Sequence, residues 1–348
     1  MKSIRARYIK YFLEFKKPAG TSRGILHKKE TYFLVLSQEN KKGIGECGIF
    51  RGLSVDDLPN YEEKLQWVCD NIQLGKAFLF QNLKQYPSIY FGLEQAYLGI
   101  ENSDCYTIFP SKFTKGEDVI PINGLIWMGE KELMQKQIDE KIKQGFSTIK
   151  LKIGAIDFAL ELQLIANIRK QFTKDDIEIR LDANGAFDPK DASEKLKKLS
   201  EFDIHSIEQP IKAGQWEMMS YLCQNSPLDI ALDEELIGVI DIASKINLME
   251  QIQPKYIILK PSLVGGIFGC NEWISLANQN NSQWWITSAL ESNIGLNAIA
   301  QYTYSLGNNL PQGLGTGGLF VNNFDSPLGI EKGCLYYDPK KKWDVDLL

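Results

Sequence analysis

The sequence is poor in the residues that build zinc sites and disulfide scaffolds. It has only two histidines, His27 and His205, among 348 residues, and its six cysteines are widely scattered. The cysteines form no C-x-x-C pair, and no histidine stands beside any of them. This spacing argues against a zinc site and against a disulfide framework. We therefore expect reduced thiols, most of them buried.

Long apolar runs are also absent. No segment approaches the roughly 18 uncharged apolar residues that a membrane-spanning helix needs. The N-terminal "MKSIRARYIKYFLEF" alternates charged and apolar residues and lacks the apolar core of a signal peptide. With a net charge of −5, the chain has no excess of positive charge for nucleic acid or an anionic membrane. We expect a cytoplasmic protein that acts on a small molecule, without a nucleic-acid or membrane partner. No motif specifies its oligomeric state.

The first third of the chain has the pattern of an α+β domain. With 348 residues, the length favours two domains or one large α/β barrel with an addition. Aromatic and β-branched strands fill residues 1–50, and helical patterns fill 60–104. We assign 1–112 to this domain. Between its first two strands, "KPAGTSRGILHKK" predicts a polar loop over 17–28 that can close over a site.

After about residue 118, short apolar strands alternate with amphipathic helices, which indicates a parallel sheet. The predicted strands are "PINGLIW", "TIKLKIG", "IEIRLDA", "HSIEQP", "IALDE", "YIILKP", "WWITSA" and "QGLGTG". One of the helices is predicted to begin with Asp188 as N-cap and Pro189 as its first residue. No helix follows the eighth strand, so we predict a (β/α)7β barrel of the TIM type over 113–320. The remainder, 321–348, is expected to pack back on the N-terminal domain.

Five predicted strands end in a charged residue: Lys152, Asp182, Glu208, Asp233 and Lys260. Their intervals of 25 to 30 residues correspond to about one βα unit each. In a parallel barrel such positions converge on the C-terminal mouth, where active sites of this fold lie. Three carboxylates placed together repel one another unless a cation lies among them. Oxygen ligands of this kind suit Mg²⁺ or Mn²⁺.

The strand "TIKLKIG" carries two lysines, Lys150 and Lys152, on the same face. A metal ion and a neighbouring ammonium group both disfavour the charged form of a lysine. We therefore expect a lowered lysine pKa and a role as general base. A metal that holds a substrate carboxylate between lysines is suited to removing the proton next to that carboxylate.

The ordered motifs "KLK", "RLDAN", "IEQP", "ALDE" and "LKP" resemble the muconate-lactonising subgroup of the enolase superfamily. The resemblance covers nearly the whole chain and implies a capping α+β domain followed by a (β/α)7β barrel. It implies that Asp182, Glu208 and Asp233 hold the metal ion, which is Mg²⁺ or Mn²⁺. It also implies that Lys152 is the acid/base on the α-carbon, with Lys260 on the opposite face of the substrate.

Further residues match positions that contact the substrate carboxylate or its distal part in this subgroup. They are Lys150, Arg180, Asn184, Ser288, Glu291 and Ser292. Other roles stay open for three of them. Arg180 can pair with a barrel carboxylate, Asn184 can belong to a turn with Gly185, and Ser292 can cap the helix that follows it.

Within the subgroup, the chain most resembles the metal-dependent lyases of menaquinone biosynthesis. The implied reaction is syn dehydration of the cyclohexadiene carboxylate SHCHC, through an enediolate, to an aromatic product. Racemisation of N-succinyl amino acids or epimerisation of dipeptides by the same lysine pair is the alternative. Dipeptide epimerases usually carry Asp-x-Asp at the eighth strand, where this chain has "GLGTGG". A non-catalytic barrel fits least, because all five strand-end residues are present.

Overall fold

The computed structural model describes residues 3–21, 24–102 and 104–345. An antiparallel sheet in the order β1-β2-β3 opens the chain, formed by β1 (Arg5–Thr21), β2 (Gly24–Gln38) and β3 (Lys41–Cys47). The helices that follow are α1 (Tyr61–Asp70), the short 3-10 helix η1 (Ile72–Leu74), α2 (Lys76–Asn82) and α3 (Pro87–Glu101). Helix α3 lies so close to β3 that a Cβ added at Gly45 would be 1.9 Å from the carbonyl oxygen of Gly92. Glycine therefore lets the helix lie directly on the sheet.

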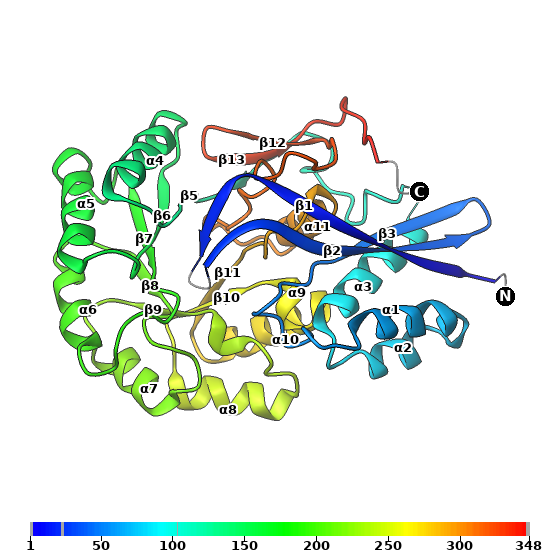
Figure 1. The fold of residues 1–348 in the computed structure, drawn as a ribbon, viewed down its shortest axis with the longest axis horizontal. Coiled ribbons are helices and arrows are strands. Elements are labelled where there is room, and N and C mark those ends of the chain that lie inside the picture. Colours follow the sequence, from blue (N-terminus) through cyan, green and yellow to red (C-terminus); the bar gives the residue numbers. More distant parts are fainter. Residues whose placement is uncertain (1–2, 22–23, 103, 346–348) are drawn as a thin grey trace.

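The predicted loop over 17–28 is wrong. Strands β1 and β2 continue through this region as a long hairpin that crosses in front of the rest of the molecule (Figure 1). The ladder has one irregularity, between Glu14 and Ala19. Pro18 falls within that interruption, where it needs no ladder partner. Backbone pairing across the hairpin thus outweighs the turn-like composition, and the residues between Thr21 and Gly24 lie outside the described part.

The second sheet has seven parallel strands in the order β11-β10-β9-β8-β7-β6-β5. They are β5 (Gly124–Ile126), β6 (Thr148–Lys152), β7 (Glu178–Asp182), β8 (Ser206–Glu208), β9 (Ile230–Leu232), β10 (Tyr256–Leu259) and β11 (Gln283–Ile286). The helices between and after them are α4 (Lys131–Lys143), α5 (Phe158–Gln171), α6 (Ala192–Ser200), α7 (Trp216–Asn225), η2 (Glu234–Leu236), α8 (Ile242–Ile252), α9 (Pro261–Val264), α10 (Gly266–Gln279) and α11 (Asn293–Ser305). The predicted parallel α/β architecture is confirmed.

Two details of this region differ from the prediction. Helix α6 begins at Ala192, because Asp188 accepts a hydrogen bond from the Lys190 amide (2.9 Å) and opens a turn over 189–191 that precedes the helix. The predicted eighth strand, "QGLGTG", is reduced to two parallel bridges, from Gln312 to Ile122 and from Gly313 to Thr287. This short segment nevertheless pairs with residues next to both edges of the seven-stranded sheet. Thr287 directly follows β11, and Ile122 lies two residues before β5.

The C-terminal segment contacts both parts of the molecule. Strands β12 (Leu328–Glu331) and β13 (Cys334–Tyr337) form a small antiparallel sheet with β4 (Ile120–Pro121). Trp343 then packs in one cluster with Phe33, Val35 and Ile44 of the first sheet.

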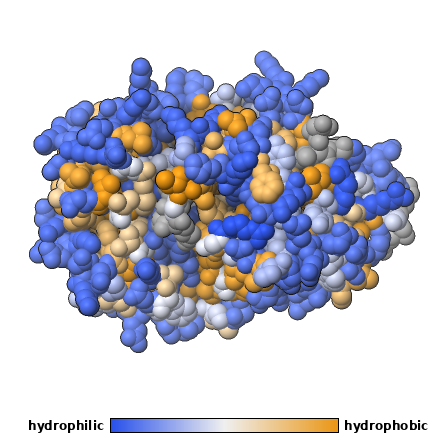
Figure 2. Space-filling view, in the orientation of Figure 1, coloured by the Kyte–Doolittle hydropathy of each residue, from blue (hydrophilic) through white to orange (hydrophobic). Residues whose placement is uncertain are grey.

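Hydrophilic residues cover most of the face shown in Figure 2, and hydrophobic ones appear among them in scattered patches. Within the described ranges, no helix is both long and apolar enough to cross a membrane.

Candidate active site

The charged strand ends come together at the carboxyl edge of the parallel sheet. Lys152, Asp182 and Glu208 end β6, β7 and β8 and are register neighbours. Asp233 and Lys260 are the residues that directly follow β9 and β10. Side chains alternate along each strand, so residues in this register share one face. The three acidic residues are buried, each with at most 2% exposure.

Ion pairs connect the lysines and carboxylates. The Nζ of Lys150 lies 3.0 Å from Asp182 Oδ2 and also donates to Glu208 Oε2. The Nζ of Lys152 lies 3.1 Å from the same Asp182 oxygen. Lys260 Nζ donates to Asp233 Oδ2. The ion pairs form two groups, Lys150 and Lys152 with Asp182 and Glu208, and Lys260 with Asp233. The groups are close enough for Glu208 to act electrostatically on Lys260, and we call the six residues the charge network.

The carboxylates stabilise the charged form of Lys150. The lowered lysine pKa expected from the sequence depends on a metal ion among these carboxylates, and it stays a prediction. Although burial alone would lower it, the Asp182 carboxylate and then that of Glu208 raise the pKa of Lys150. Burial is likewise outweighed at Asp182, where Lys150, followed by Lys152, lowers the pKa of the carboxyl. Asp233 raises the pKa of Lys260 in the same way. Without a metal ion, the acidic groups therefore favour the protonated forms of Lys150 and Lys260.

Glu208 is the member of the network whose charge is least compensated. Burial and then the adjacent Asp182 carboxylate raise its pKa well above the ordinary range. Its Oε1 is buried and has no hydrogen-bond partner among the described residues. A buried carboxylate oxygen without a partner is costly unless a cation or donor approaches it. This oxygen, in a set of hard oxygen donors, fits a divalent cation.

As they stand, the described side chains include no group of three or more His, Cys, Asp or Glu arranged to hold a metal ion. The ion pairs explain this, because lysine ammonium groups lie against Asp182 and Asp233. A cation entering among the carboxylates would take over the positive charge that the lysines now supply. The donor set fits a metal ion, but the lysines must shift to admit it.

A pocket opens above the network. Lys150, Lys152, Asp182 and Lys260 form part of its lining. Two further predicted residues, Asn184 and Ser288, also line it. Asn184 accepts a hydrogen bond from Lys152 Nζ at 2.7 Å. The pocket therefore combines the charged groups with polar positions from the ends of β7 and β11.

Glu234 is a polar lining residue that the sequence did not single out for the pocket. It follows Asp233 directly and accepts a hydrogen bond from Asn184 Nδ2 at 3.0 Å. A strictly alternating strand would turn it away from the pocket, but β9 ends at Leu232 and a 3-10 helix begins at Glu234. The change of backbone conformation redirects the side chain.

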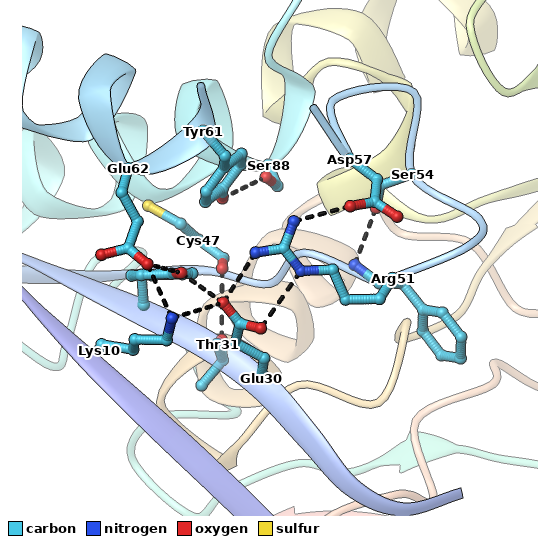
Figure 3. Close-up of polar contacts among 12 residues, drawn as sticks. Lys10, Glu30, Thr31, Cys47, Arg51, Ser54, Asp57, Tyr61, Glu62 and Ser88 are labelled. Atoms are coloured by element: carbon cyan, nitrogen blue, oxygen red, sulfur yellow. Dashed lines mark hydrogen bonds and ion pairs between the residues drawn. The ribbon is translucent and has the colours of Figure 1, made fainter. Parts of the chain in front are cut away.

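The N-terminal part of the chain supplies an apolar wall of the pocket, which no sequence signal predicted. Phe50 and Leu53 line the pocket from the segment between β3 and α1. Figure 3 shows Arg51, which lies between them in sequence, bridging Glu30 on β2 and Asp57 in the same segment. The contacts measure 2.7 Å to Glu30 Oε1 and 2.7 Å to Asp57 Oδ1. The guanidinium group therefore fixes this wall to the sheet.

The structure does not bring Arg180 into the pocket. Its side chain is 1% exposed and points toward the amino end of the sheet, where Nε donates to Glu178 (2.8 Å) and Nη1 to the Pro311 carbonyl oxygen (2.8 Å). The guanidinium group also lies over the Trp285 ring, 4.3 Å from its centroid. The alternative interpretation, pairing with a carboxylate inside the sheet, describes this geometry.

Glu291 and Ser292 are also not among the residues that line the pocket. Ser292 is the N-cap, with its hydroxyl accepting from the Ile294 amide, and it donates to the buried Glu46 of β3 at 2.5 Å. Glu291 is fully buried and accepts hydrogen bonds from Ser262 and from the Ala289 amide. Ser292 therefore has the capping role that the sequence left open.

Comparisons with known proteins agree with this geometry. The family described as Enolase C-terminal domain-like matches residues 133–340. The chain is 43% identical to o-succinylbenzoate synthase of Desulfotalea psychrophila, over 96% of this chain and 99% of that one. The crystal structure of MenC from the same organism matches with a TM-score of 0.86 and 39% identity, over 96% and 99% of the two chains.

A more distant structure has the same fold. The L-Ala-D/L-Glu epimerase from Bacillus subtilis matches with a TM-score of 0.82 and 18% identity, over 97% of this chain and 96% of that one. At this identity the match speaks for the fold alone. The resemblance drawn from the sequence motifs is confirmed at the level of the family.

Proposed function

We propose that this chain, which belongs to the enolase superfamily, is an o-succinylbenzoate synthase, a lyase that dehydrates SHCHC to o-succinylbenzoate in menaquinone biosynthesis. The relative with 43% identity over 96% of the chain has this activity in its name. The observation that carries the proposal is the convergence of Lys152, Lys260 and Asp182 on one pocket, with Glu208 and Asp233 ion-paired to its lining residues Lys150 and Lys260.

The finer architecture belongs to the same proposal. The parallel bridges of Gln312 and Gly313 to both edges of the sheet support a closed (β/α)7β barrel. We assign 1–112 to the capping domain, 113–320 to the barrel and 321–348 to a C-terminal segment that packs on the capping domain. The packing of Trp343 against Phe33 supports the last assignment.

The roles of the lysines follow from their positions. Lys152 removes the proton next to the substrate carboxylate and then returns a proton to the departing hydroxyl, which leaves as water. The ring becomes aromatic in this step, so the enzyme mainly stabilises the enediolate intermediate. Lys260, on the other side of the network, stays cationic and lowers the energy of that negative charge. Lys150 supports Lys152 and the substrate carboxylate.

The metal site would be formed by Asp182, Glu208 and Asp233. Enzymes of this superfamily use a divalent metal, and the hard oxygen donors favour Mg²⁺, with Mn²⁺ as a substitute. When bound, the ion neutralises charge that develops on the substrate carboxylate. The unpartnered oxygen of Glu208 supports its place in this set. Asn184 and Ser288 would contact the substrate from the pocket wall.

The test is incubation with SHCHC and Mg²⁺ while the aromatic product is followed by ultraviolet absorbance. We expect turnover by the wild type and a loss of about 10²- to 10⁴-fold in kcat for Lys152→Ala, since general acid–base catalysis contributes that much. The matched control is Lys28→Ala, which removes an exposed lysine that pairs with Glu14 on the hairpin. Unchanged turnover in Lys152→Ala would contradict the proposal.

Racemisation of N-succinyl amino acids is the second candidate, because Lys152 and Lys260 approach the pocket from different strands and can serve as two bases. Exchange of the α-proton of N-succinyl amino acids with D₂O measures it. Exchange without dehydration of SHCHC would favour the racemase.

A further inference from the structure

Gln209, the residue that directly follows Glu208, forms hydrogen bonds with all four positions of its side-chain amide. Its Oε1 accepts from the backbone amides of Asp233 (3.2 Å) and Glu235 (3.2 Å). Its Nε2 donates to the Ile211 carbonyl oxygen (3.0 Å) and to Glu235 Oε2 (3.0 Å). An amide offers two acceptor and two donor positions, so none is left for a metal ion or substrate.

The backbone of Gln209 connects the same three strand ends. Its amide donates to the Ala231 carbonyl oxygen of β9 at 2.9 Å, and its carbonyl oxygen accepts from the Gly185 amide, beyond β7, at 2.7 Å. Gln209 itself continues from β8. It therefore touches the ends of β7, β8 and β9, the strands that carry Asp182, Glu208 and Asp233.

The backbone conformation of Gln209 adds a second observation. Its φ is +40°, in the left-handed region that residues other than glycine rarely adopt, and its side chain is fully buried. Strained backbone of this kind persists where surrounding contacts hold it, and it gathers at functional sites. Here the four side-chain hydrogen bonds provide those contacts, directly beside the carboxylate network.

We infer that Gln209 is a positioning residue for the metal site: it fixes the relative placement of the three carboxylates without binding the ion. Its side chain binds the backbone amide of Asp233 and so fixes the position of Asp233 relative to Glu208, the residue before Gln209. Its carbonyl oxygen binds the Gly185 amide and so fixes the turn that follows Asp182. The inference rests on the proposed function, because it takes these three residues as the metal ligands.

The test is Mn²⁺ affinity, measured by titration calorimetry on the full chain without substrate, together with the thermal midpoint. Removing groups that orient metal ligands typically weakens metal binding about 10- to 100-fold. We expect a loss of that size for Gln209→Ala.

Gln301→Ala is the matched control. Gln301 is also fully buried, and its Oε1 accepts from two backbone amides, those of Ile108 (2.9 Å) and Phe109 (3.0 Å). Its Nε2 likewise donates to two acceptors. It lies on α11, away from β7–β9. Gln301→Ala should lower the thermal midpoint and leave Mn²⁺ affinity within about twofold of wild type, since it touches no metal ligand.

A reciprocal exchange separates positioning from simple loss of stability. Gln209→Glu keeps the acceptor but sets two carboxylates against each other at Glu235, so Mn²⁺ binding should weaken. Adding Glu235→Gln supplies a new side-chain donor for the carboxylate at position 209 and should recover most of the Mn²⁺ affinity. The recovery is incomplete because the Ile211 carbonyl oxygen still lacks the donor that Gln209 provides. This pair also carries the test should Gln209→Ala fail to fold.

The outcomes are distinct. If the wild type binds Mn²⁺ and the Gln209 variants bind it as tightly as Gln301→Ala does, the inference is overturned and the proposed function stands. The absence of Mn²⁺ binding by the wild type would overturn the proposed metal site and the inference with it.

Discussion

Asp56 provides a prediction whose sign and size follow from its surroundings. The carboxyl is fully buried in the segment that carries Phe50 and Leu53. Its Oδ2 accepts from the Ser88 amide (2.9 Å) and hydroxyl (2.6 Å), while Oδ1 has no partner among the described residues. Burial raises the pKa of Asp56 from 3.8 to about 6.

A raised folded-state pKa means that the folded state holds the proton more tightly than the unfolded state. The stabilisation is full below about pH 4 and is lost as the pH rises through about 6. The difference between the pKa of 3.8 and the pKa of about 6 corresponds to about 3 kcal/mol of stabilisation in total. About 1.4 kcal/mol of this is lost between about pH 5 and pH 8. The Asp56→Asn variant cannot ionise and does not lose this contribution.

Urea unfolding of wild type and Asp56→Asn at about pH 5 and about pH 8 measures the effect. The free energy of unfolding of the variant, relative to wild type, should increase by about 1.4 kcal/mol between the two conditions. Any pH-independent change in the free energy of unfolding caused by the Asn side chain is the same at both pH values and therefore cancels. Asp57→Asn is the control, because Asp57 has a lowered pKa and stays ionised over this range. Equal pH dependence of wild type and Asp56→Asn would refute the reasoning.

Variants at two further positions probe the contacts between the N-terminal part of the chain and helices α10 and α11. Ser292→Ala should lower the free energy of unfolding by about 1 to 2 kcal/mol in urea, because it removes the N-cap of α11 and a donor to Glu46, whereas Ser292→Thr should retain most of it. Burial raises the pKa of Glu94 to about 8, so wild-type stability should fall as the pH rises through that value. Glu94→Gln should lack this fall in thermal midpoint between about pH 7 and pH 9, and a parallel fall would contradict the assignment.

The sequence predicted the parts of the site that depend on strand register. The five charged strand ends could be aligned because each closes an apolar strand, and strand alternation then places them on one face. Arg180 shows the limit of this argument. It shares the face of Asp182, but register does not say toward which end of a barrel a long side chain extends, and Glu178 and Pro311 draw it toward the other end.

Residues that enter the pocket from beyond the end of a strand or helix could not be predicted from the alternation of apolar and polar residues. Glu234 enters the pocket because a 3-10 helix starts there, and Phe50 and Leu53 enter it from a segment without regular structure. The hairpin over 17–28 was misjudged because its composition is that of a turn, while its conformation is decided by pairing between strands.

Three buried or mostly buried carboxyl groups of the N-terminal domain share one structural task. Glu46 accepts from the Ser292 and Gly295 amides at the start of α11, Glu94 from those of Ile267 and Phe268 at the start of α10, and Asp56 from that of Ser88 at the start of α3. The free amides at each helix start need acceptors, and a carboxyl oxygen supplies one whether the group is charged or, like Glu94 below its pKa of about 8, neutral.

Two of these contacts, those of Glu46 and Glu94, join the N-terminal part of the chain to α11 and α10, and the third holds the segment that carries Phe50 and Leu53. The apolar wall formed by Phe50 and Leu53 is thus held through its own segment, and the elements beside it are attached to α10 and α11. This rigidity matters for the proposed reaction, because a site that stabilises an enediolate needs its groups in place before the charge develops. Loosening either domain contact should therefore reduce turnover without touching a residue of the charge network.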